Sequence, residues 1–301
     1  MELIIRNDDM QEVEGITAQY PYVLNHVNGK NTKVPWHWHE EVEFSYVVQG
    51  SLRVTVSGRS YVFREKEGFY INSNILHTME AEHREEEEKT VWYSYLFHPM
   101  FLGGHYKSVF ETKYIAPVLK NKKYEIAAFR SENPRQKEIL QLLLQAAELQ
   151  GQQDCEFRIR NTFSDIWLIL MRELENTEHD AMQMNPVNQE RIQSMLAYIH
   201  QHYAEKITLD QVAQAALISK RECLRCFQSC IQKTPIEYLL DYRVRVAEKL
   251  LRTTSLSVTQ IALQTGFSNS AYFTKMFREH SGLSPSQYRK QNDTHTGKGD
   301  R

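Results

Sequence analysis

Two stretches in the C-terminal part of the chain share one pattern. The first runs Ile207-Thr-Leu-Asp-Gln-Val-Ala213, then Ser219, then Arg225-Cys-Phe227, and the second runs Leu256-Ser-Val-Thr-Gln-Ile-Ala262, then Ser268, then Lys275-Met-Phe277. The copies lie 49 residues apart at the serines and 50 at the phenylalanines, so the second copy has one extra residue. Each copy predicts a short helix capped by Thr208 or Ser257, a turn, and a second helix capped by Ser219 or Ser268. Two such helix-turn-helix patterns in tandem are a specific signal.

The second helix of each copy has an apolar and a polar face. Cys223, Cys226, Phe227 and Cys230 recur at helical spacing and predict the buried face of the first copy, as Phe273, Met276 and Phe277 do for the second. In a helix-turn-helix unit the polar face of this helix meets DNA in the major groove. Arg225 and Lys275 hold equivalent positions and are the first candidates for base contact. The candidate DNA-contacting residues are Ser219, Lys220, Arg221, Leu224, Arg225 and Gln228 in the first copy and Ser268, Asn269, Ser270, Thr274, Lys275 and Arg278 in the second.

Charge is divided unevenly along the 301 residues. From Pro186 to the end there are 16 Lys and Arg against 10 Asp and Glu, a balance of +6, whereas residues 1–185 hold 20 against 28, a balance of −8. The overall charge of −2 therefore hides an acidic and a basic part, which suggests two modules with different partners. A hydrophobic content of 41% and a charged content of 25% are ordinary for a globular protein and argue against disorder.

Compartment signals are weak and consistent. No apolar run approaches the ~20 residues needed to span a bilayer, and the first residues lack the pattern of a signal peptide. The four cysteines are too few for a disulfide scaffold, so we expect a cytoplasmic protein without a membrane partner. Cys223-Leu-Arg-Cys226 has a spacing found at zinc sites, but the repeat places Phe273 and Met276 there, which favours core cysteines.

Short strands are predicted over roughly the first 100 residues. Residues 42–49, 51–57, 61–63, 69–71 and 90–97 are apolar, aromatic or alternating, and several are separated by turn residues. This spacing is typical of an all-β sandwich or barrel. The period then changes, and residues 134–150 and 157–174 predict two amphipathic helices. The fold class is therefore α+β and multidomain, with a β-barrel and helical hairpin followed by an all-α domain.

Domain boundaries follow from these changes of pattern. We expect a barrel over 1–132, a helical hairpin over 133–175, a linker over 176–188, a tandem helix-turn-helix domain over 189–291 and a disordered tail over 292–301. The linker range is polar and contains Pro186. The hairpin can pack on the barrel or pair with a second chain.

Residues 190–290 resemble the DNA-binding domain of AraC/XylS-type transcription regulators. The resemblance rests on Ile261-Ala, Gly266-Phe-Ser, Tyr272-Phe-Thr-Lys-Met-Phe277-Arg and Gly282-Leu-Ser-Pro-Ser-Gln-Tyr288-Arg289, with 235–251 matching the helix that joins the two units. It implies that the two units enter successive major-groove turns on one face of the duplex. The first unit departs from the family pattern, because Gln232 stands where the family usually has glycine and cysteines replace aliphatic residues.

The acidic part resembles a cupin barrel. Pro35-Trp-His37-Trp-His39-Glu-Glu-Val-Glu43, followed by six residues and Gly50, is similar to the first cupin motif, and Gly68-Phe-Tyr-Ile-Asn-Ser-Asn-Ile-Leu-His77 to the second. The resemblance implies that His37, His39, Glu43 and His77 converge, as the ligands of metal-binding cupins do, and this donor set suits Zn, Fe, Mn or Ni. Asn72-Ser-Asn departs from the usual proline-containing loop, and barrels in such regulators often lack metal. We therefore expect no metal or other cofactor and keep these four residues as the alternative ligand set.

Aromatic residues near the histidines suggest a pocket for a small molecule. Aromatic rings with a few polar groups suit a sugar or related metabolite, although half of the rings can belong to the barrel core. The candidate pocket residues are Trp36, His37, Trp38, His39, Glu43, Tyr46, Tyr70 and His77.

The leading hypothesis is a non-enzymatic, ligand-responsive regulator that binds double-stranded DNA. Its further expected partners are a small-molecule effector, a second copy of the chain and RNA polymerase. The alternative is a metal-dependent cupin enzyme with a helical appendage, which leaves the duplicated helix-turn-helix unexplained.

Overall fold

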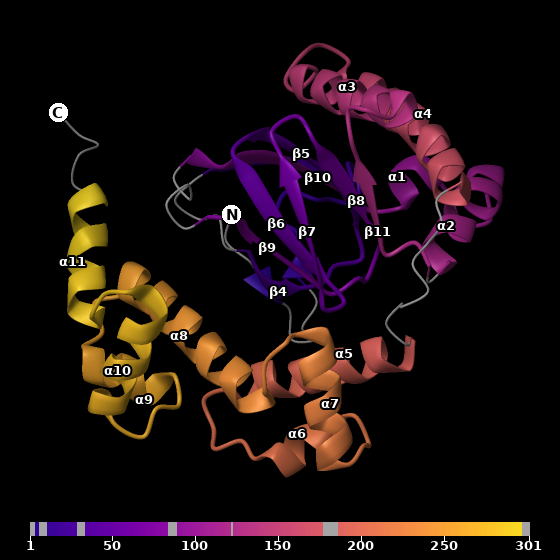
Figure 1. The fold of residues 1–301 in the computed structure, drawn as a ribbon. Helices are drawn as coiled ribbons and strands as arrows, with labels where there is room; N and C mark the ends of the chain where they lie inside the picture. The colour runs from indigo at the N-terminus through magenta and orange to yellow at the C-terminus, as the bar shows by residue number, and fades with distance from the viewer. Residues whose placement is uncertain are drawn as a thin grey trace. The chain divides into compact units, whose positions relative to one another are not determined.

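The computed structural model describes residues 4–5, 11–28, 34–83, 89–121, 123–176 and 186–296. The chain divides into two compact units, Met1–Gln189 and Glu190–Arg301. The first holds the strands and the second is helical (Figure 1). Within the described residues, every helix is too short or too polar to cross a membrane.

Antiparallel strands form the body of the first unit. A five-stranded sheet has the order β11 (Ile126–Phe129), β8 (Gly68–Ile71), β5 (Val42–Gln49), β10 (Val91–Phe97) and β3 (Tyr22–Asn28). A four-stranded sheet has the order β4 (Val34–His37), β9 (His77–Ala81), β6 (Ser51–Val56) and β7 (Arg59–Arg64). A separate pair joins β1 (Ile4–Ile5) to β2 (Gln11–Glu12). The predicted strand-rich, cupin-like fold class is confirmed.

The five-stranded sheet is buried on both faces. Side chains alternate between the faces of a strand, so Val47 of β5 joins Phe69, Met79 and Trp92 in a core that draws on both sheets. Phe44 lies three residues before Val47 in β5 and so on the opposite face, where it packs in a second core with the helices.

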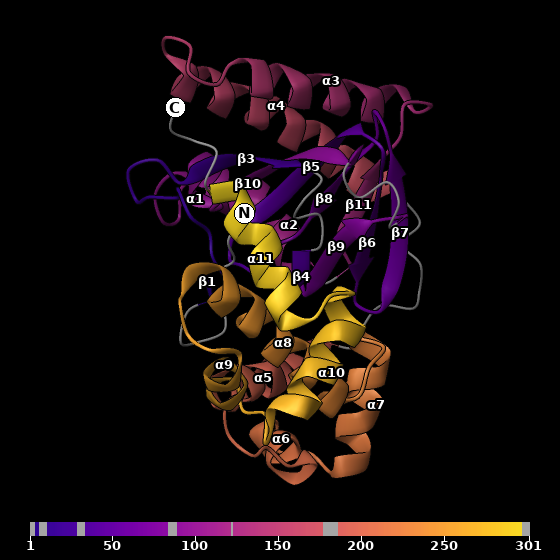
Figure 2. The same ribbon diagram turned by 90° about the vertical axis from the view of Figure 1, so that its left-hand side faces the viewer.

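Helices cover the outer face of that sheet. They are α1 (Met100–Gly103), the π-helix η3 (Phe110–Ile115), α2 (Ala116–Lys120), α3 (Pro134–Glu148) and α4 (Cys155–Asn176). α3 and α4 pack side by side and lie along the sheet (Figure 2). Asn133 caps α3, as its Oδ1 accepts from the amides of Arg135 and Gln136. The stripes predicted for both helices are buried, including Ile139 and Leu143 of α3 and Phe163 and Leu170 of α4.

The second unit is the predicted helical domain. Its helices are α5 (Pro186–His202), α6 (Leu209–Ala215), α7 (Lys220–Cys230), α8 (Pro235–Thr253), α9 (Val258–Gln264), α10 (Ser270–Ser281) and α11 (Pro285–Thr296). Thr208 and Ser257 begin α6 and α9 with full capping boxes, as the repeat predicts for caps. The second helices of the two patterns are α7 and α10, which we call the first and second recognition helices.

Glycine in the second turn permits a close backbone contact. Gly266 has φ +80°, and a Cβ there would lie 2.8 Å from the carbonyl oxygens of Tyr203 and Ala204. Leu217 holds the equivalent place in the first copy, also with positive φ (54°), and is 89% exposed. Gln232, which stands where the family usually has glycine, has φ 62°. The fold thus demands left-handed backbone at positions where the first copy lacks glycine.

Three details differ from the sequence-based expectations. Asn269, rather than Ser268, caps the second recognition helix, because its side chain accepts from the amide of Tyr272. The extra residue of the second copy therefore lies in its turn. α5 begins at Pro186, inside the expected linker, since proline is favoured in the first turn of a helix. α11 reaches Thr296, inside the expected disordered tail. The rest of that tail, 297–301, and linker residues 177–185 lie outside the described residues.

Candidate metal centre and nucleic-acid interface

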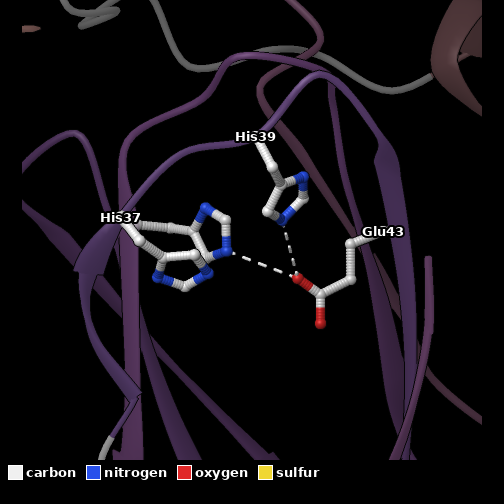
Figure 3. A group of neighbouring side chains, drawn as sticks. His37, His39 and Glu43 are labelled. Carbon is white, nitrogen blue, oxygen red and sulfur yellow. Dashed lines mark ion pairs between the residues drawn. The ribbon is translucent and has the colours of Figure 1, made fainter. Parts of the chain in front are cut away.

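Four ligating side chains converge between the two sheets of the barrel. His37 ends β4, His77 begins β9, Glu43 lies in β5, and His39 lies in the connection from β4 to β5. Their ligand atoms all lie within 4.8 Å of one another, and all four residues are buried. The side chains of His37, His39 and Glu43 point toward a common centre (Figure 3). The structure therefore brings together the four residues that the two motifs single out.

Backbone carbonyls orient the three imidazoles. The Nδ1 atoms of His37, His39 and His77 lie 2.8, 2.9 and 2.7 Å from the carbonyl oxygens of residues 35, 41 and 75. A carbonyl oxygen only accepts, so each Nδ1 donates and each Nε2 is the ring nitrogen that remains for another ligand. The Nε2 atoms of His39 and His77 are buried without a hydrogen-bond partner.

Glu43 is held so that one carboxylate oxygen faces the imidazoles. Ser45 and Ser94 donate to Oε1 at 3.0 and 2.6 Å. Oε2 lies 3.6 Å from Nε2 of His39 and 3.3 Å from Nε2 of His77. Burial alone would raise the pKa of Glu43, but contact with the two imidazoles holds it well below its usual range, so the carboxylate is ionised.

Burial favours the neutral form of His37, the third histidine of the cluster. Burial, together with the neighbouring imidazoles of His77 and His39, lowers the pKa of His37 well below its ordinary value. Neutral imidazoles and an ionised carboxylate are the protonation states that a transition-metal site requires. The donor set and its burial fit a divalent transition metal.

A cavity of about 10 Å³ adjoins this histidine–glutamate cluster. It is lined by Val27, Val34, His37, His39, Glu43, Met79, Trp92, Ser94 and Leu96. This volume accommodates about one water-sized group. Ser94 and Trp92 are site residues that sequence reasoning missed, although both lie with Leu96 on one face of the predicted strand over 90–97.

Four aromatic residues expected in the pocket do not line it: Trp36, Trp38, Tyr46 and Tyr70. Tyr46 and Tyr70 belong to the core beneath α3 and α4, on the opposite face of the sheet from Glu43. Tyr70 donates to Asn72 at 2.9 Å and packs edge-on against Trp167 of α4.

The first recognition helix presents its expected polar face. Cys223, Cys226, Phe227 and Cys230 are buried, as predicted for the core, and all four cysteines of the chain are free thiols. Burial raises the pKa of Cys223 to about 11, which keeps the thiol protonated. The six candidate DNA contacts, Ser219, Lys220, Arg221, Leu224, Arg225 and Gln228, are exposed.

The second recognition helix is similar, with small differences. Phe273 and Phe277 are buried, while Met276 packs partly buried against the same core. Of the six candidates, Ser268, Asn269, Lys275 and Arg278 are exposed, and Ser270 and Thr274 are half-buried.

Carboxylates contact the cations of both recognition helices. Lys220 lies 3.1 Å from Asp210, and Lys275 lies 3.9 Å from Glu279. Arg225 contacts Glu222, and this contact lowers the pKa of Glu222. The candidate base-reading groups therefore have acidic neighbours within the chain.

Comparison with known proteins agrees with both halves of this description. Residues 212–291 match a helix-turn-helix domain model, and residues 26–93 match a cupin domain model. The chain is 29% identical over 285 residues to the uncharacterized HTH-type transcriptional regulator YdeC of Bacillus subtilis, covering 93% of this chain and 94% of YdeC. It is 30% identical over 160 residues to the HTH-type transcriptional activator RhaS of Escherichia coli, covering 52% and 55% of the two chains.

Solved structures with partial likeness include a regulator with an AraC-type DNA-binding domain from Chromobacterium violaceum. That match has 27% identity and a TM-score of 0.35 and covers 38% of this chain and all of the other. An apo form of ToxT from Vibrio cholerae has 15% identity and a TM-score of 0.46, over 89% of this chain and 97% of that one. The domain models and the sequence relatives show that the chain carries a cupin domain followed by an AraC-type helix-turn-helix domain, and that its relatives are HTH-type transcriptional regulators.

Proposed function

We propose that this regulator reads a specific DNA site with its two recognition helices and that occupancy of the barrel changes that reading. The observation that carries the proposal is one chain that holds a buried ligating cluster in one unit and two exposed basic helices in the other. A signal and its response are thereby assigned to separate units.

The barrel is proposed to hold a divalent transition metal on His37, His39, Glu43 and His77. Two lines of support are the convergence of four ligand atoms and the buried Nε2 atoms that lack hydrogen-bond partners. A bound cation would supply positive charge where three imidazole nitrogens and a carboxylate meet. The serines and backbone carbonyls described above would keep the ligands in that orientation.

Metal occupancy is also our proposal for the signal, in place of the sugar that the aromatic residues suggest. Small-molecule pockets usually measure about 300–1,000 Å³, and the cavity beside the cluster measures about 10 Å³. A sugar would need the two sheets to move apart, whereas an ion needs no such opening. Stabilisation by a sugar but not by Zn²⁺, Mn²⁺ or Ni²⁺ in a thermal-shift screen would reverse this choice.

Base contact is proposed for Arg225 and Lys275, and backbone contact for the exposed residues at the start of each recognition helix. The arginine and lysine side chains suit guanine edges, and helix N-termini suit phosphates. Selection of binding sites from random duplex DNA tests this assignment. We expect one enriched motif, affinity that falls steeply with salt, and loss of a base preference in Arg225→Ala. Absence of an enriched motif would contradict the proposal.

A second copy of the chain is proposed to pair along α3 and α4. Leu144, Phe157 and Leu168 are apolar and exposed on this hairpin, and such side chains suit an interface. Sedimentation of wild type and Leu168→Glu tests it, with a dimer expected for the first and a monomer for the second.

Catalysis is not part of the proposal, because the sequence relatives are transcriptional regulators. A cytoplasmic location agrees with the four free cysteines.

We propose residues 1–132 as the sensing barrel, 133–175 as the hairpin, and the helices from residue 189 onward as the DNA-reading domain. Contact with RNA polymerase remains a prediction from the family resemblance.

A further inference from the structure

On the first recognition helix, the carboxylate of Glu222 contacts the guanidinium group of Arg225 at two points. Nε of Arg225 lies 3.0 Å from Oε2 of Glu222, and Nη2 lies 2.6 Å from Oε1. Parallel contacts of this kind fix both the position and the plane of a guanidinium group. Arg225 therefore has a defined orientation before any DNA is present.

A second arginine anchors the carboxylate. Nη1 of Arg191, from α5, lies 3.2 Å from Oε1 of Glu222. The Glu222 side chain is 26% exposed and that of Arg225 is 69% exposed. The carboxylate is thus fixed against the domain, while the guanidinium it holds extends outward.

This position differs between the two copies of the repeat. When the helix caps Ser219 and Asn269 are aligned, Glu222 corresponds to Tyr272, and Arg225 corresponds to Lys275. The second recognition helix has no acidic residue in its first turn. Its lysine instead has Glu279 one turn later, at 3.9 Å. The two-point contact between a carboxylate and the candidate base-reading residue is thus a feature of the first copy.

Capping does not account for Glu222. Four other helices of this unit close a capping box with the third helical residue, which is Gln211, Glu237, Gln260 or Gln287. In α7 the corresponding residue is Glu222, and its two carboxylate oxygens contact arginine side chains instead.

The contacts leave the reading edge of Arg225 available. Glu222 occupies the edge formed by Nε and Nη2, so the edge formed by Nη1 and Nη2 still presents two N–H groups. That pair matches O6 and N7 of guanine. An arginine fixed beforehand also loses less rotamer freedom when it docks.

We propose that Glu222 is a specificity-determining residue that positions Arg225 for a guanine edge and discourages it from binding phosphates. The proposal rests on the proposed base contact of Arg225. The proposal assigns the first recognition helix a stricter base preference than the second, because Lys275 has no such two-point contact.

Selection from random duplex DNA with the full chain tests this, using wild type, Glu222→Gln, Arg225→Ala and Asp210→Asn. Asp210→Asn is the matched control, because it makes the same change of charge beside Lys220, 3.1 Å away. We expect Glu222→Gln to lower the preference for guanine at the position that Arg225→Ala identifies by about tenfold. Other positions of the motif should persist, and affinity for random DNA should rise. Asp210→Asn should keep the guanine preference.

The failures are distinguishable. If Glu222→Gln keeps the guanine preference, or raises affinity for selected and random DNA equally, Glu222 is only a competing charge and the inference is wrong. If wild type enriches no motif, or Arg225→Ala changes no base preference, the proposed DNA contact itself fails. Thermal unfolding of each variant confirms that only folded proteins are compared.

Discussion

Oε2 of Glu43 lies 3.3 Å from Nε2 of His77 inside a buried site. Nδ1 of His77 donates to the carbonyl oxygen of Ile75, so Nε2 is the ring nitrogen that faces Glu43. An imidazole nitrogen and a carboxylate oxygen are both groups that bind divalent transition metals. This relationship is why we propose the cluster as a metal site.

Removal of one ligand is the first test. We expect wild type to retain about one divalent ion per chain after dialysis, and His77→Ala to retain almost none. His83→Ala is the control, because that histidine is 64% exposed and outside the cluster. Elemental analysis gives the result, and equal metal content in wild type and His77→Ala would exclude this site.

The serine that orients Glu43 gives a finer test. Ser94→Ala removes the 2.6 Å hydrogen bond to Oε1 without touching a ligand atom. Loss of such a supporting contact typically weakens metal affinity by about 10–100-fold. Competition with a chelating dye measures the affinity, and bound Co²⁺ reports the ligand geometry by its visible spectrum. Ser60→Ala, at an exposed serine, should change neither; an unchanged affinity in Ser94→Ala would show that Glu43 needs no orientation.

Substitutions in the two turns of the tandem motif should differ in their effect on the free energy of unfolding. Gly266→Ala places a Cβ 2.8 Å from two carbonyl oxygens at φ +80°, so we expect a loss of about 2–4 kcal/mol in the free energy of unfolding. Leu217→Gly relieves a left-handed leucine that is almost fully exposed, so we expect no loss. Urea unfolding of both variants measures this, and equal effects would contradict the assigned turn geometry.

Acid should weaken the second unit through Asp241. Burial alone would raise the pKa of Asp241, but contacts with His280 and Lys233 lower it to about 2, from 3.8. The ionised form is therefore stabilised by folding, and its contribution is present above pH 4 and lost as the pH falls towards 2. Because the carboxylate is partly exposed, we expect Asp241→Asn to cost about 1 kcal/mol at pH 6. The difference from wild type should shrink in acid, and a constant difference would contradict this.

Periodicity and repetition predicted much of the fold. The stripes of α3 and α4 and the buried faces of both recognition helices follow from helical spacing, because those segments bury one continuous side. β3 was missed because Asn25 and His26 interrupt its apolar residues. β4 overlaps the first cupin-like motif and β9 begins at the last residue of the second, so the signal there came from resemblance and not from alternation.

The site was predicted in part. Residue types and spacing identified the four ligating residues, but the aromatic pocket depended on which face each ring occupies. Tyr46 lies three residues after Glu43 in one strand, so alternation places the two on opposite faces. The cap at Asn269 and the contact of Glu222 with Arg225 are i, i+3 contacts at or within one helix. The contact of Glu222 with Arg191 joins two helices, so residue spacing does not predict it.

Operator affinity with and without metal is the most direct test of the central claim. Fluorescence anisotropy of the selected DNA motif should be measured with the full chain, metal-free and after addition of one equivalent of Zn²⁺ or Mn²⁺. We expect affinity to change by about 5–150-fold in wild type, the usual range of coupling between sites, and to stay constant in Glu43→Gln. Equal affinity of the metal-free and metal-loaded wild-type chain would contradict the account.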